Sequence, residues 1–291
     1  MGKKMAEIDC LELIRDALES NKYLSLCQIF YLRPRVFKKP DRVTTVVNSL
    51  CCLFKCTRSS LHVVADESCL VIGHVQYKQG GTTISCLAEG GTRRLIARTM
   101  GLITEMKDIG AQFILVVEKE TVFQRLVEEN LHIKVPCIIV TGGGQPGVAT
   151  RLFVRRMRYE LGLPTFALMD CDAFGIRLFS TYKYGLKTLS FDSGRLTIPD
   201  IKLLGLLPSQ IKACGISEVA KLKMGENEIQ NIEQLLKEEH VKINPRLEYE
   251  LQKMLESGKK IELDALCFSQ PFAYKTDVFV KEMIADNQWV D

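Results

Sequence analysis

The sequence predicts a mixed α/β fold in which a helical N-terminal part is followed by a parallel β-sheet. Two short apolar runs carry this prediction, residues 113–117 and residues 165–169. Each run is bounded by polar residues, which is typical of a strand buried on both faces of a parallel sheet. Each run also ends in carboxylates: Glu118 follows the first, and Asp170 and Asp172 follow the second.

The first part of the chain predicts a winged-helix domain over residues 1–80. Residues 6–24 and 41–57 have the spacing of amphipathic helices. The pattern then changes to two short strands, residues 60–65 and 69–77, which a polar turn would join into a hairpin. Helices followed by a hairpin are typical of the winged helix, which places a helix in a DNA groove. Many small α+β domains share this pattern.

The second predicted domain covers residues 94–291. Glycines at both ends of residues 79–92 favour a flexible connection before it. Residues 208–262 are predicted to be helical and charged, with a break at Pro245. Alternation of strands and helices predicts a doubly wound parallel sheet. The predicted strands are 113–117, 135–140, 165–169 and 186–191, and the predicted helices are 120–130, 148–160 and 173–183.

The carboxylates at the strand ends predict a divalent-metal site. Parallel strands end at the same edge of a sheet, where ligands bind in α/β proteins. Glu118, Asp170 and Asp172 would repel one another there unless a cation lies between them, and all-oxygen ligation suits Mg²⁺ or Mn²⁺. The alternative is that these residues cap the helices that follow them. Because a helix needs only one cap, the pair at 170 and 172 favours the metal site.

Composition limits the class of protein. The chain has 291 residues, of which 46% are hydrophobic and 25% charged, and this is ordinary for a globular protein. No apolar stretch is long enough for a transmembrane helix, so no membrane partner is expected. The odd number of cysteines, eleven, favours reduced thiols in a cytosolic or nuclear protein over a disulfide framework.

Basic residues gather in groups although the formal net charge is only +4. Arg151, Arg155 and Arg158 have the spacing of one helix face. Any single group would be an ordinary solvated face, but several in one chain predict a surface that follows the phosphates of a nucleic acid. The other groups are Arg93, Arg94 and Arg98, and Arg33, Arg35, Lys38, Lys39 and Arg42.

Two further features allow more than one interpretation. Residues 142–147 are rich in glycine and lie between a predicted strand and a helix, where backbone N–H groups can approach a phosphate. Alone they are more typical of a tight turn, and the neighbouring carboxylates favour the phosphate interpretation. Tyr31 lies in an apolar stretch, which is typical of a core aromatic residue. A nucleophilic tyrosine would need an exposed hydroxyl with cations or a metal nearby.

Several ordered blocks carry a family resemblance that extends from about residue 24 to the C-terminus. The blocks are Ile29-Phe-Tyr31, Arg58-Ser-Ser-Leu-His-Val-Val-Ala65, Val117-Glu-Lys-Glu-Thr-Val-Phe-Gln-Arg-Leu126, Thr150-Arg-Leu-Phe-Val-Arg-Arg156, Leu168-Met-Asp-Cys-Asp-Ala-Phe-Gly-Ile176, Thr181-Tyr-Lys-Tyr-Gly185 and Leu204-Gly-Leu-Leu-Pro-Ser209. In these blocks the chain resembles the A-type component of archaeal topoisomerase VI and its eukaryotic relative, the meiotic recombination endonuclease. The resemblance is expected to be closest to the meiotic branch.

The resemblance implies a winged-helix domain followed by a Toprim domain, and a type IIB topoisomerase-like transesterase that makes meiotic double-strand breaks. By position, Tyr31 would be the nucleophile that forms a 5′-phosphotyrosyl link, because Phe30 occupies the other aromatic position of the family. Glu118, Asp170 and Asp172 would bind Mg²⁺, or alternatively Mn²⁺.

The resemblance also implies partners and a location. The family works as a homodimer on double-stranded DNA, with the tyrosine of one protomer meeting the metal site of the other. Arg58, Arg151 and Arg155 are the expected DNA-binding residues of this chain. The chain has no nucleotide-hydrolysis motif, so any ATP dependence would come from a topoisomerase VI B-type subunit. Meiotic accessory proteins are further expected partners, and the expected location is the nucleus.

The chain departs from the family pattern at two positions that bear on catalysis. Cys27 stands where the family has arginine, and Gly143 stands where it has lysine. Loss of cations near the scissile phosphate would weaken stabilisation of the transition state. Two alternatives therefore stay open: a DNA-binding scaffold of the same fold with weak or no catalysis, and a Toprim hydrolase or primase that acts without a tyrosine.

Overall fold

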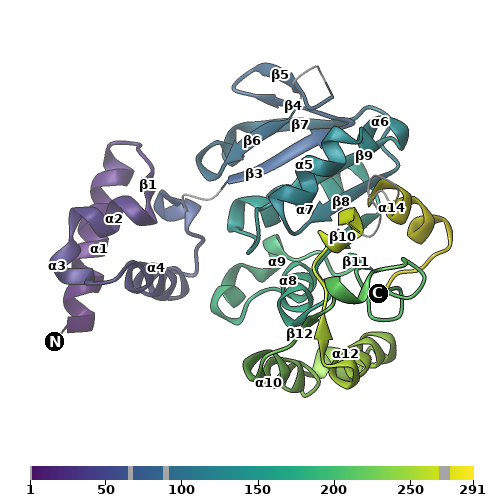
Figure 1. Ribbon diagram of the computed structural model, residues 1–291. Helices are drawn as coiled ribbons and strands as arrows, with labels where there is room; N and C mark the ends of the chain where they lie inside the picture. The colour runs from purple at the N-terminus through teal and green to yellow at the C-terminus, as the bar shows by residue number, and fades with distance from the viewer. Residues whose placement is uncertain (1, 65–67, 88–91, 269–275) are drawn as a thin grey trace.

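The computed structural model describes residues 2–64, 68–87, 92–268 and 276–291. Figure 1 shows a small helical domain at the N-terminus beside a larger α/β domain built on a central sheet. The predicted mixed α/β fold with a parallel sheet is confirmed. None of the helices within the described ranges is long and apolar enough to cross a membrane.

The N-terminal domain packs its helices around a hydrophobic core of its own. The helices are α1 (Gly2–Glu19), α2 (Leu26–Leu32), α3 (Pro34–Phe37) and α4 (Pro40–Phe54). A capping box starts α2: the Ser25 hydroxyl accepts from the backbone N–H of Gln28, and the Gln28 side chain accepts from that of Ser25. Ile29 and Phe37 are fully buried in the core, so α2 and α3 are held by packing on one side only.

The strands that follow this domain differ from the prediction. The expected hairpin of residues 60–65 and 69–77 is wrong, because residues 60–64 belong to η1 (Ser59–Leu61) and β2 (Val63–Val64), and β2 pairs with β1 (Leu24–Ser25). Residues 65–67 lie outside the described ranges. The next strand, β3 (Ser68–Gly73), joins the large sheet instead. Its run of buried residues from 69 to 72 has no polar alternation, which suits a strand covered on both faces.

The larger domain is built on a six-stranded sheet with the order β11–β10–β8–β9–β3–β6. The parallel strands are β8 (Phe113–Val117), β9 (Cys137–Thr141), β10 (Thr165–Leu168) and β11 (Lys202–Gly205). Strand β3 runs antiparallel to both β9 and β6 (Arg93–Ile96). Every residue of β8, β9 and β10 is buried, which explains their continuous apolar sequences.

Helices follow the parallel strands and complete the domain. Helices α5 (Glu120–Glu128) and α6 (Leu131–Lys134) connect β8 to β9, α7 (Val148–Leu161) connects β9 to β10, and α8 (Ala173–Lys183) follows β10. The C-terminal part contains η3 (Lys187–Asp192), α9 (Ser193–Leu196), η4 (Glu218–Ala220), β12 (Leu222–Lys223), α10 (Glu226–Leu235), α11 (Glu239–Lys242), α12 (Pro245–Ser257), β13 (Lys259–Lys260), α13 (Ala265–Phe268) and α14 (Thr276–Ala285).

Two smaller predictions are also corrected. Residues 186–191 form most of the 3₁₀ helix η3 and not a strand, because β11 takes the place beside β10. Part of the expected linker, residues 79–92, is β5 (Thr82–Ser85), which with β4 (Val75–Gln79) and β7 (Ile103–Asp108) forms a second sheet. The 3₁₀ helix η2 (Ala97–Leu102) precedes β7. The predicted break at Pro245 is confirmed: α11 ends at Lys242, and Pro245 begins α12 with Asn244 as its N-cap.

The two domains touch through α4 and η3. The side-chain amide of Asn48 donates to the carbonyl of Thr188 at 3.2 Å. Phe191, at the end of η3, packs against the core of the N-terminal domain. The contact is formed by helices, so it leaves the strand ends of the large sheet uncovered by the N-terminal domain (Figure 1).

The close approach of β3 to β9 can be tested at Gly73. Gly73 and Gly81 both have positive φ angles, 118° and 86°, so alanine would be strained at either position. A Cβ at Gly73 would lie 2.1 Å from the carbonyl oxygen of Cys137, whereas a Cβ at Gly81 would meet nothing within 4 Å. We expect Gly73→Ala to lower the free energy of unfolding by about 2 kcal/mol more than Gly81→Ala in urea denaturation. Equal losses would contradict this packing.

Candidate metal centre

The sheet brings two of the predicted metal-binding segments together. Strands β8 and β10 are parallel neighbours, and their last residues, Val117 and Leu168, are partners in register. The backbone N–H of Glu118 donates to the carbonyl of Leu168 at 3.0 Å, so the pairing continues one residue past the strand. Glu118 and Asp170 therefore leave the sheet at the same edge, as expected for carboxyl ends of parallel strands.

Glu118 is buried and held in place by the neighbouring segment. Its side chain is only 5% exposed, and its Oε2 accepts a hydrogen bond from the backbone N–H of Asp170 at 2.8 Å. Burial, together with the negative charges of Asp170 and Asp172, raises the pKa of Glu118 to about 7, against the opposing effect of that hydrogen bond. The cost of burying a charged Glu118 is therefore only partly offset by its neighbours.

Both carboxylate oxygens of Asp170 have partners. Oδ1 accepts from the backbone N–H of Leu263 at 2.8 Å, and Oδ2 lies 3.0 Å from the ammonium nitrogen of Lys119. Burial raises the pKa of Asp170, and these two partners oppose the shift. The side chain of Asp170 is therefore fixed in orientation by a segment that lies 93 residues further along the chain.

Asp172 serves the structural role that the alternative interpretation gave it. It is the N-cap of α8, where its Oδ1 accepts from the backbone N–H of Gly175 at 2.7 Å. Helix α8 begins very close to the strand end: a Cβ at Gly175 would lie 2.3 Å from the carbonyl oxygen of Asp170. Capping occupies one oxygen of Asp172, so the carboxylate can cap the helix and still offer its other oxygen to a cation.

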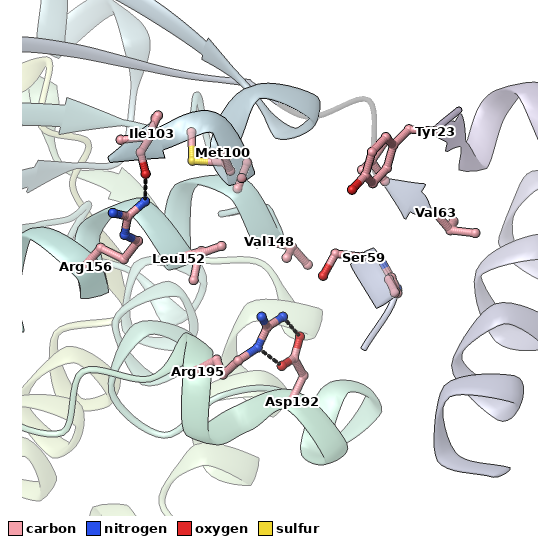
Figure 2. Close-up of a pocket in the computed structure, with 14 residues that line it drawn as sticks. Tyr23, Ser59, Val63, Met100, Ile103, Val148, Leu152, Arg156, Asp192 and Arg195 are labelled. Atoms are coloured by element: carbon pink, nitrogen blue, oxygen red, sulfur yellow. Dashed lines mark hydrogen bonds and ion pairs between the residues drawn. The ribbon is translucent and has the colours of Figure 1, made fainter. Parts of the chain in front are cut away.

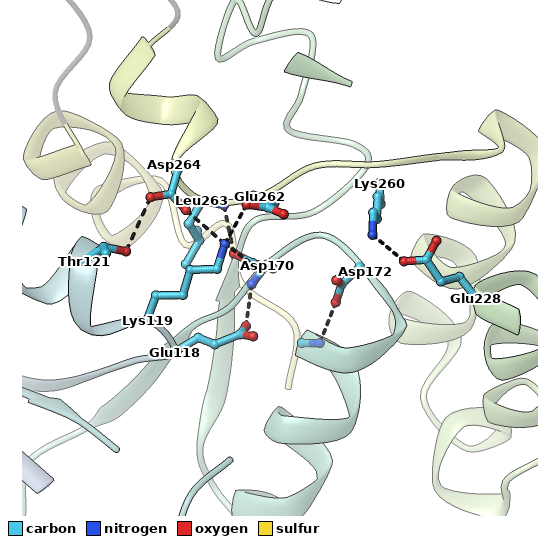
Figure 3. Close-up of polar contacts among 11 residues, drawn as sticks. Glu118, Lys119, Thr121, Asp170, Asp172, Glu228, Lys260, Glu262, Leu263 and Asp264 are labelled. Carbon is cyan, nitrogen blue, oxygen red and sulfur yellow. Dashed lines mark hydrogen bonds and ion pairs between the residues drawn. The ribbon is translucent and has the colours of Figure 1, made fainter. Parts of the chain in front are cut away.

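Lys119 lies at the centre of this cluster and was missed by sequence reasoning (Figure 3). Its ammonium nitrogen lies 3.0 Å from Asp170, 2.9 Å from Glu262 and 2.9 Å from Asp264. Burial alone would lower the pKa of Lys119, but these hydrogen bonds raise it well above its usual value. The position of Lys119 directly after Glu118 was a signal in the sequence, whereas Glu262 and Asp264 are too distant in sequence to be associated with the strand ends.

The side chains at the sheet edge are of the chemical type that binds a hard divalent cation. The groups at the sheet edge are carboxylates, which Mg²⁺ and Mn²⁺ prefer. The raised pKa of Glu118 indicates that a further cation would be stabilised there. Within the described ranges, however, no three His, Cys, Asp or Glu side chains are grouped closely enough to hold a metal ion. The carboxylates would have to turn from their present partners to form a complete coordination sphere.

The glycine-rich loop lies against the same edge. The backbone N–H of Gly144 donates to the carbonyl of Glu118 at 2.8 Å, and that of Gly143 donates to the hydroxyl of Thr141 at 3.1 Å. Gly143 has a φ of 67°, a backbone conformation that favours glycine over lysine. The loop is thus next to the predicted metal site, and the residue that replaces the family lysine matches the backbone conformation.

Tyr31 lies on α2, far from these carboxylates in the same chain. Its side chain is 72% exposed, and it contacts Phe30 edge to face at a centroid distance of 5.3 Å. The expectation of a core tyrosine is therefore wrong. Cys27 is also exposed, one helical turn before Tyr31. Figure 1 places α2 in the N-terminal domain, on the side away from the ends of β8 and β10.

The arginines of α7 are directed into the protein. Arg151 is fully buried, and its Nε lies 3.4 Å from the carbonyl of Leu196, so the predicted DNA contact by Arg151 is wrong in this fold. Arg155 bonds the carbonyl of Thr197 and stacks on Tyr159, and Arg158 pairs with Asp200. The spacing of these arginines was recognised correctly, but the face that they share packs on α9.

Arg58 lines a cavity of about 330 Å³ between the two domains. Figure 2 shows this cavity between Tyr23, Ser59 and Val63 of the N-terminal domain and Met100, Val148 and Leu152 of the larger one. Arg58 donates to the side chain of Asn48 at 2.8 and 3.0 Å. The cavity contains none of the predicted metal ligands, so it is a feature of the domain contact and not of the candidate metal centre.

Exposed basic residues follow Tyr31 in the sequence of the N-terminal domain. Arg35, Lys38 and Lys39 are exposed and come after the end of α2 at Leu32. Arg33, by contrast, pairs with Asp9 at 3.3 Å. Of the three basic groups in the sequence, the group after α2 lies in the same domain as the exposed Tyr31 and contains exposed cations.

Comparison with known proteins yields two family matches. The model of the Toprim domain shared by Spo11 and the A-type component of topoisomerase 6 matches residues 113–284. A second model, described as "Type IIB DNA topoisomerase", matches residues 5–63. These two stretches correspond to the sheet that carries the carboxylates and to the helices that carry Tyr31.

Three relatives are similar over nearly the whole chain. The A-type component of DNA topoisomerase 6 of Arabidopsis thaliana and the A3 component of Oryza sativa subsp. indica are each 37% identical over 280 residues, which is 96% of this chain and 65% and 63% of theirs. Meiotic recombination protein SPO11-1 of Arabidopsis thaliana is 33% identical over 277 residues, 94% of this chain and 75% of that protein. The chain spans just under two thirds of the topoisomerase components. The identities do not support the predicted closer resemblance to the meiotic branch.

The raised pKa of Glu118 predicts how stability of the metal-free protein depends on pH. The native state keeps a proton on Glu118 up to about pH 7, whereas the unfolded state loses it near the ordinary value of 4.5. Between these values the native state binds more protons, so the contribution of Glu118 to stability is lost as the pH rises. The full effect is roughly 3 kcal/mol.

Urea unfolding in EDTA at several pH values between about 4.5 and 8 would measure this effect. Buried His132 and half-buried His240 have lowered pKa values, chiefly from loss of solvent, and their contributions change with pH in the opposite direction. The informative quantity is therefore the difference between the parent chain and Glu118→Gln. We expect the stability of Glu118→Gln relative to the parent to increase with pH. A difference that does not change with pH would contradict the assignment.

Proposed function

Because the chain belongs to the family of Spo11 and the A-type component of topoisomerase 6, we propose that it is a DNA-cleaving transesterase that makes meiotic double-strand breaks as a dimer. Tyr31 is the nucleophile, and Glu118, Asp170 and Asp172 bind Mg²⁺, or Mn²⁺ in its place. Each protomer cuts one strand of the duplex. The products are a double-strand break and two 5′-phosphotyrosyl links between protein and DNA.

The separation of Tyr31 from the carboxylates is the observation that carries this proposal. A phosphate-attacking tyrosine needs an exposed hydroxyl, and Tyr31 is 72% exposed. The carboxylates lie on the other domain, on the edge of the large sheet, so one chain does not bring the two halves together (Figure 1). Two copies can do so if the tyrosine of each reaches the sheet edge of the other. The separation thus supports a composite site in a homodimer.

The chemistry is a transesterification. The Tyr31 oxygen attacks the scissile phosphorus and loses its proton, a bond forms between them, and the bond from phosphorus to the 3′ oxygen of the neighbouring sugar breaks. The leaving 3′ oxygen takes up a proton, so no water or nucleotide is consumed. A divalent ion, when bound, would stabilise negative charge on the phosphate or on the leaving oxygen. The carboxylates of this chain would fix that ion beside the strand ends.

The basic residues after α2 would hold the DNA backbone near the nucleophile. Arg35, Lys38 and Lys39 are exposed and follow Tyr31 in the sequence, so they are available to contact DNA phosphates. They would supply positive charge that Cys27 does not supply in the position of the family arginine. Arg58 and Arg155 would need to leave their present partners to bind DNA.

A second candidate is the catalytic component of a type IIB topoisomerase, which cleaves and reseals DNA. The higher identity to the topoisomerase 6 relatives favours it, 37% against 33% for the meiotic relative. Relaxation of supercoiled DNA by the chain with ATP and a B-type subunit would indicate this function. Covalent breaks that are not resealed would indicate the meiotic one. In either case the chain would act in the nucleus, with a B-type subunit or meiotic accessory proteins.

Tyr31→Phe should abolish covalent attachment of the protein to DNA. The change removes the attacking oxygen and keeps the ring, so folding should be preserved. We expect no 5′-linked protein after incubation of the chain and its B-type partner with duplex DNA and Mg²⁺, whereas Tyr249→Phe, a change at another exposed tyrosine, should leave attachment unchanged. Attachment by Tyr31→Phe would show that another residue is the nucleophile. DNA binding without attachment by the parent chain would favour the inactive scaffold.

Mixed dimers would test the composite site. A dimer of one Tyr31→Phe chain and one Asp170→Asn chain keeps one intact pairing if the tyrosine acts on the partner's metal site, and none if it acts on its own. We expect single-strand nicks from the mixed dimer and no cleavage from either variant alone, measured on end-labelled duplex DNA. Complete inactivity of purified mixed dimers would contradict the composite site.

A further inference from the structure

A continuous groove follows one face of helix α7. Beside the cavity between the domains, a second cavity of about 290 Å³ lies along α7, and the two cavities share Leu152, Arg156 and Arg195 as lining residues. Val148 lines the first cavity, and Tyr159 lines the second. Residues 148, 152, 156 and 159 have the spacing of one helix face. The two cavities therefore form one groove, which this face of α7 lines.

The groove is lined by more positive than negative side chains. Its described lining residues include four arginines, at positions 58, 155, 156 and 195, and two carboxylates, those of Glu160 and Asp192. Arg195 is exposed, and its Nε and Nη2 both donate to Asp192. A guanidinium group has five N–H donors, so these two bonds leave others for a further acceptor. The excess of positive charge favours an anionic ligand.

Each of the two cavities also contains an exposed tyrosine. Tyr23 lies across the first cavity from Leu152 (Figure 2), and its ring stacks on that of His62 at a centroid distance of 4.4 Å and an interplanar angle of 13°. Tyr159 lines the second cavity, where the guanidinium group of Arg155 lies 4.5 Å from its ring centroid. Tyr23 is 42% exposed and Tyr159 is 53% exposed. Each ring is thus held by one planar partner and keeps accessible surface for another.

We propose that this groove binds single-stranded DNA. Unpaired bases stack on Tyr23 and Tyr159, and the phosphates between them are held by Arg156 and Arg195, which line both cavities. Proteins that bind single strands combine a positively charged groove with aromatic side chains on which bases stack. The inference goes beyond the proposed function, in which duplex DNA has to reach only Tyr31 and the carboxylates.

The form of the groove favours a single strand over a duplex. The cavity between the domains has a volume of about 330 Å³, and much of its lining is apolar, including Met100, Ile103 and Leu152. A pocket of this size and character takes a small planar molecule. An unstacked base can enter it, whereas the bases of a duplex stay stacked inside the double helix. A duplex could therefore contact the rim of the groove but not the tyrosine rings inside it.

The groove begins close to the candidate metal centre. Helix α7 starts at Val148, directly after the glycine-rich loop, and the backbone N–H of Gly144 in that loop donates to the carbonyl of Glu118. The face of α7 from Val148 to Tyr159 extends over about 16 Å, given the rise of an α-helix. A strand that is unpaired at the sheet edge can therefore continue along α7 for a few nucleotides.

The test is the affinity of the chain for a labelled oligothymidylate, measured by fluorescence anisotropy in EDTA. We expect Tyr23→Leu and Tyr159→Leu each to weaken binding roughly tenfold, because each removes one stacking surface. Tyr159→Phe keeps the ring and should bind as the parent does. Arg195→Gln should weaken binding and reduce the dependence of affinity on salt, because it removes a phosphate contact.

Helix α12 provides matched controls outside the groove. Tyr249 is 49% exposed, and the ammonium group of Lys253 lies 4.7 Å from its ring centroid, so Tyr249→Leu removes a similar tyrosine beside a cation. Arg246 is also exposed, so Arg246→Gln removes an equivalent charge. Neither residue lines the groove, and we expect both variants to bind the oligonucleotide as the parent does.

Three outcomes would overturn the inference. The first is a parent chain that does not bind the oligonucleotide, or binding that the groove variants leave unchanged. The second is a duplex of the same length that binds as tightly and loses as much affinity in Tyr159→Leu, because no unpaired base would then be needed. The third is displacement of the oligonucleotide by polyglutamate at equal charge, which would indicate a general anion site. EDTA removes divalent ions and no cleavage is measured, so failure of the proposed function would not produce any of these results.

Discussion

Two carboxylates are buried where the neighbouring strands β8 and β10 end, and burial of like charges is unfavourable unless nearby groups compensate for it. The compensation comes from several directions: a backbone N–H for Glu118, another for Asp170, and the ammonium group of Lys119. It is incomplete, since the pKa of Glu118 stays raised. A cation bound at this edge would offset part of the remaining cost of burying these carboxylates.

This constraint explains why the C-terminal part of the chain belongs to the site. Glu262, Leu263 and Asp264 reach the sheet edge because β13 and the bridge between Cys171 and Ile261 guide the chain across it. Without this segment, Lys119 would keep only Asp170 as a partner, and Asp170 would lose its backbone N–H donor. The helices from α10 to α12 thus support the site from a distance by holding the segment in place.

Sequence reasoning predicted the strands and helices that depend on local pattern. The buried runs at β8 and β10, the strand ends at Glu118 and Asp170, and helix α7 all follow from hydrophobic periodicity. The insertion of β3 between β9 and β6 could not be predicted, because strand pairing over 60 or more residues leaves no periodic signal. Burial of Arg151 was missed for a related reason: spacing identifies a shared face but not what covers it.

The composite site that we propose also changes how the two departures from the family pattern are understood. Cys27 lies with Tyr31 on α2, whereas Gly143 lies beside Glu118 at the sheet edge, so the two lost cations belong to opposite halves of the site. Each half must then attract phosphate by other groups. The half with the tyrosine has exposed cations after α2. At the sheet edge the ammonium group of Lys119 is paired with three carboxylates, so the proposed divalent ion would be the cation that contacts the phosphate there.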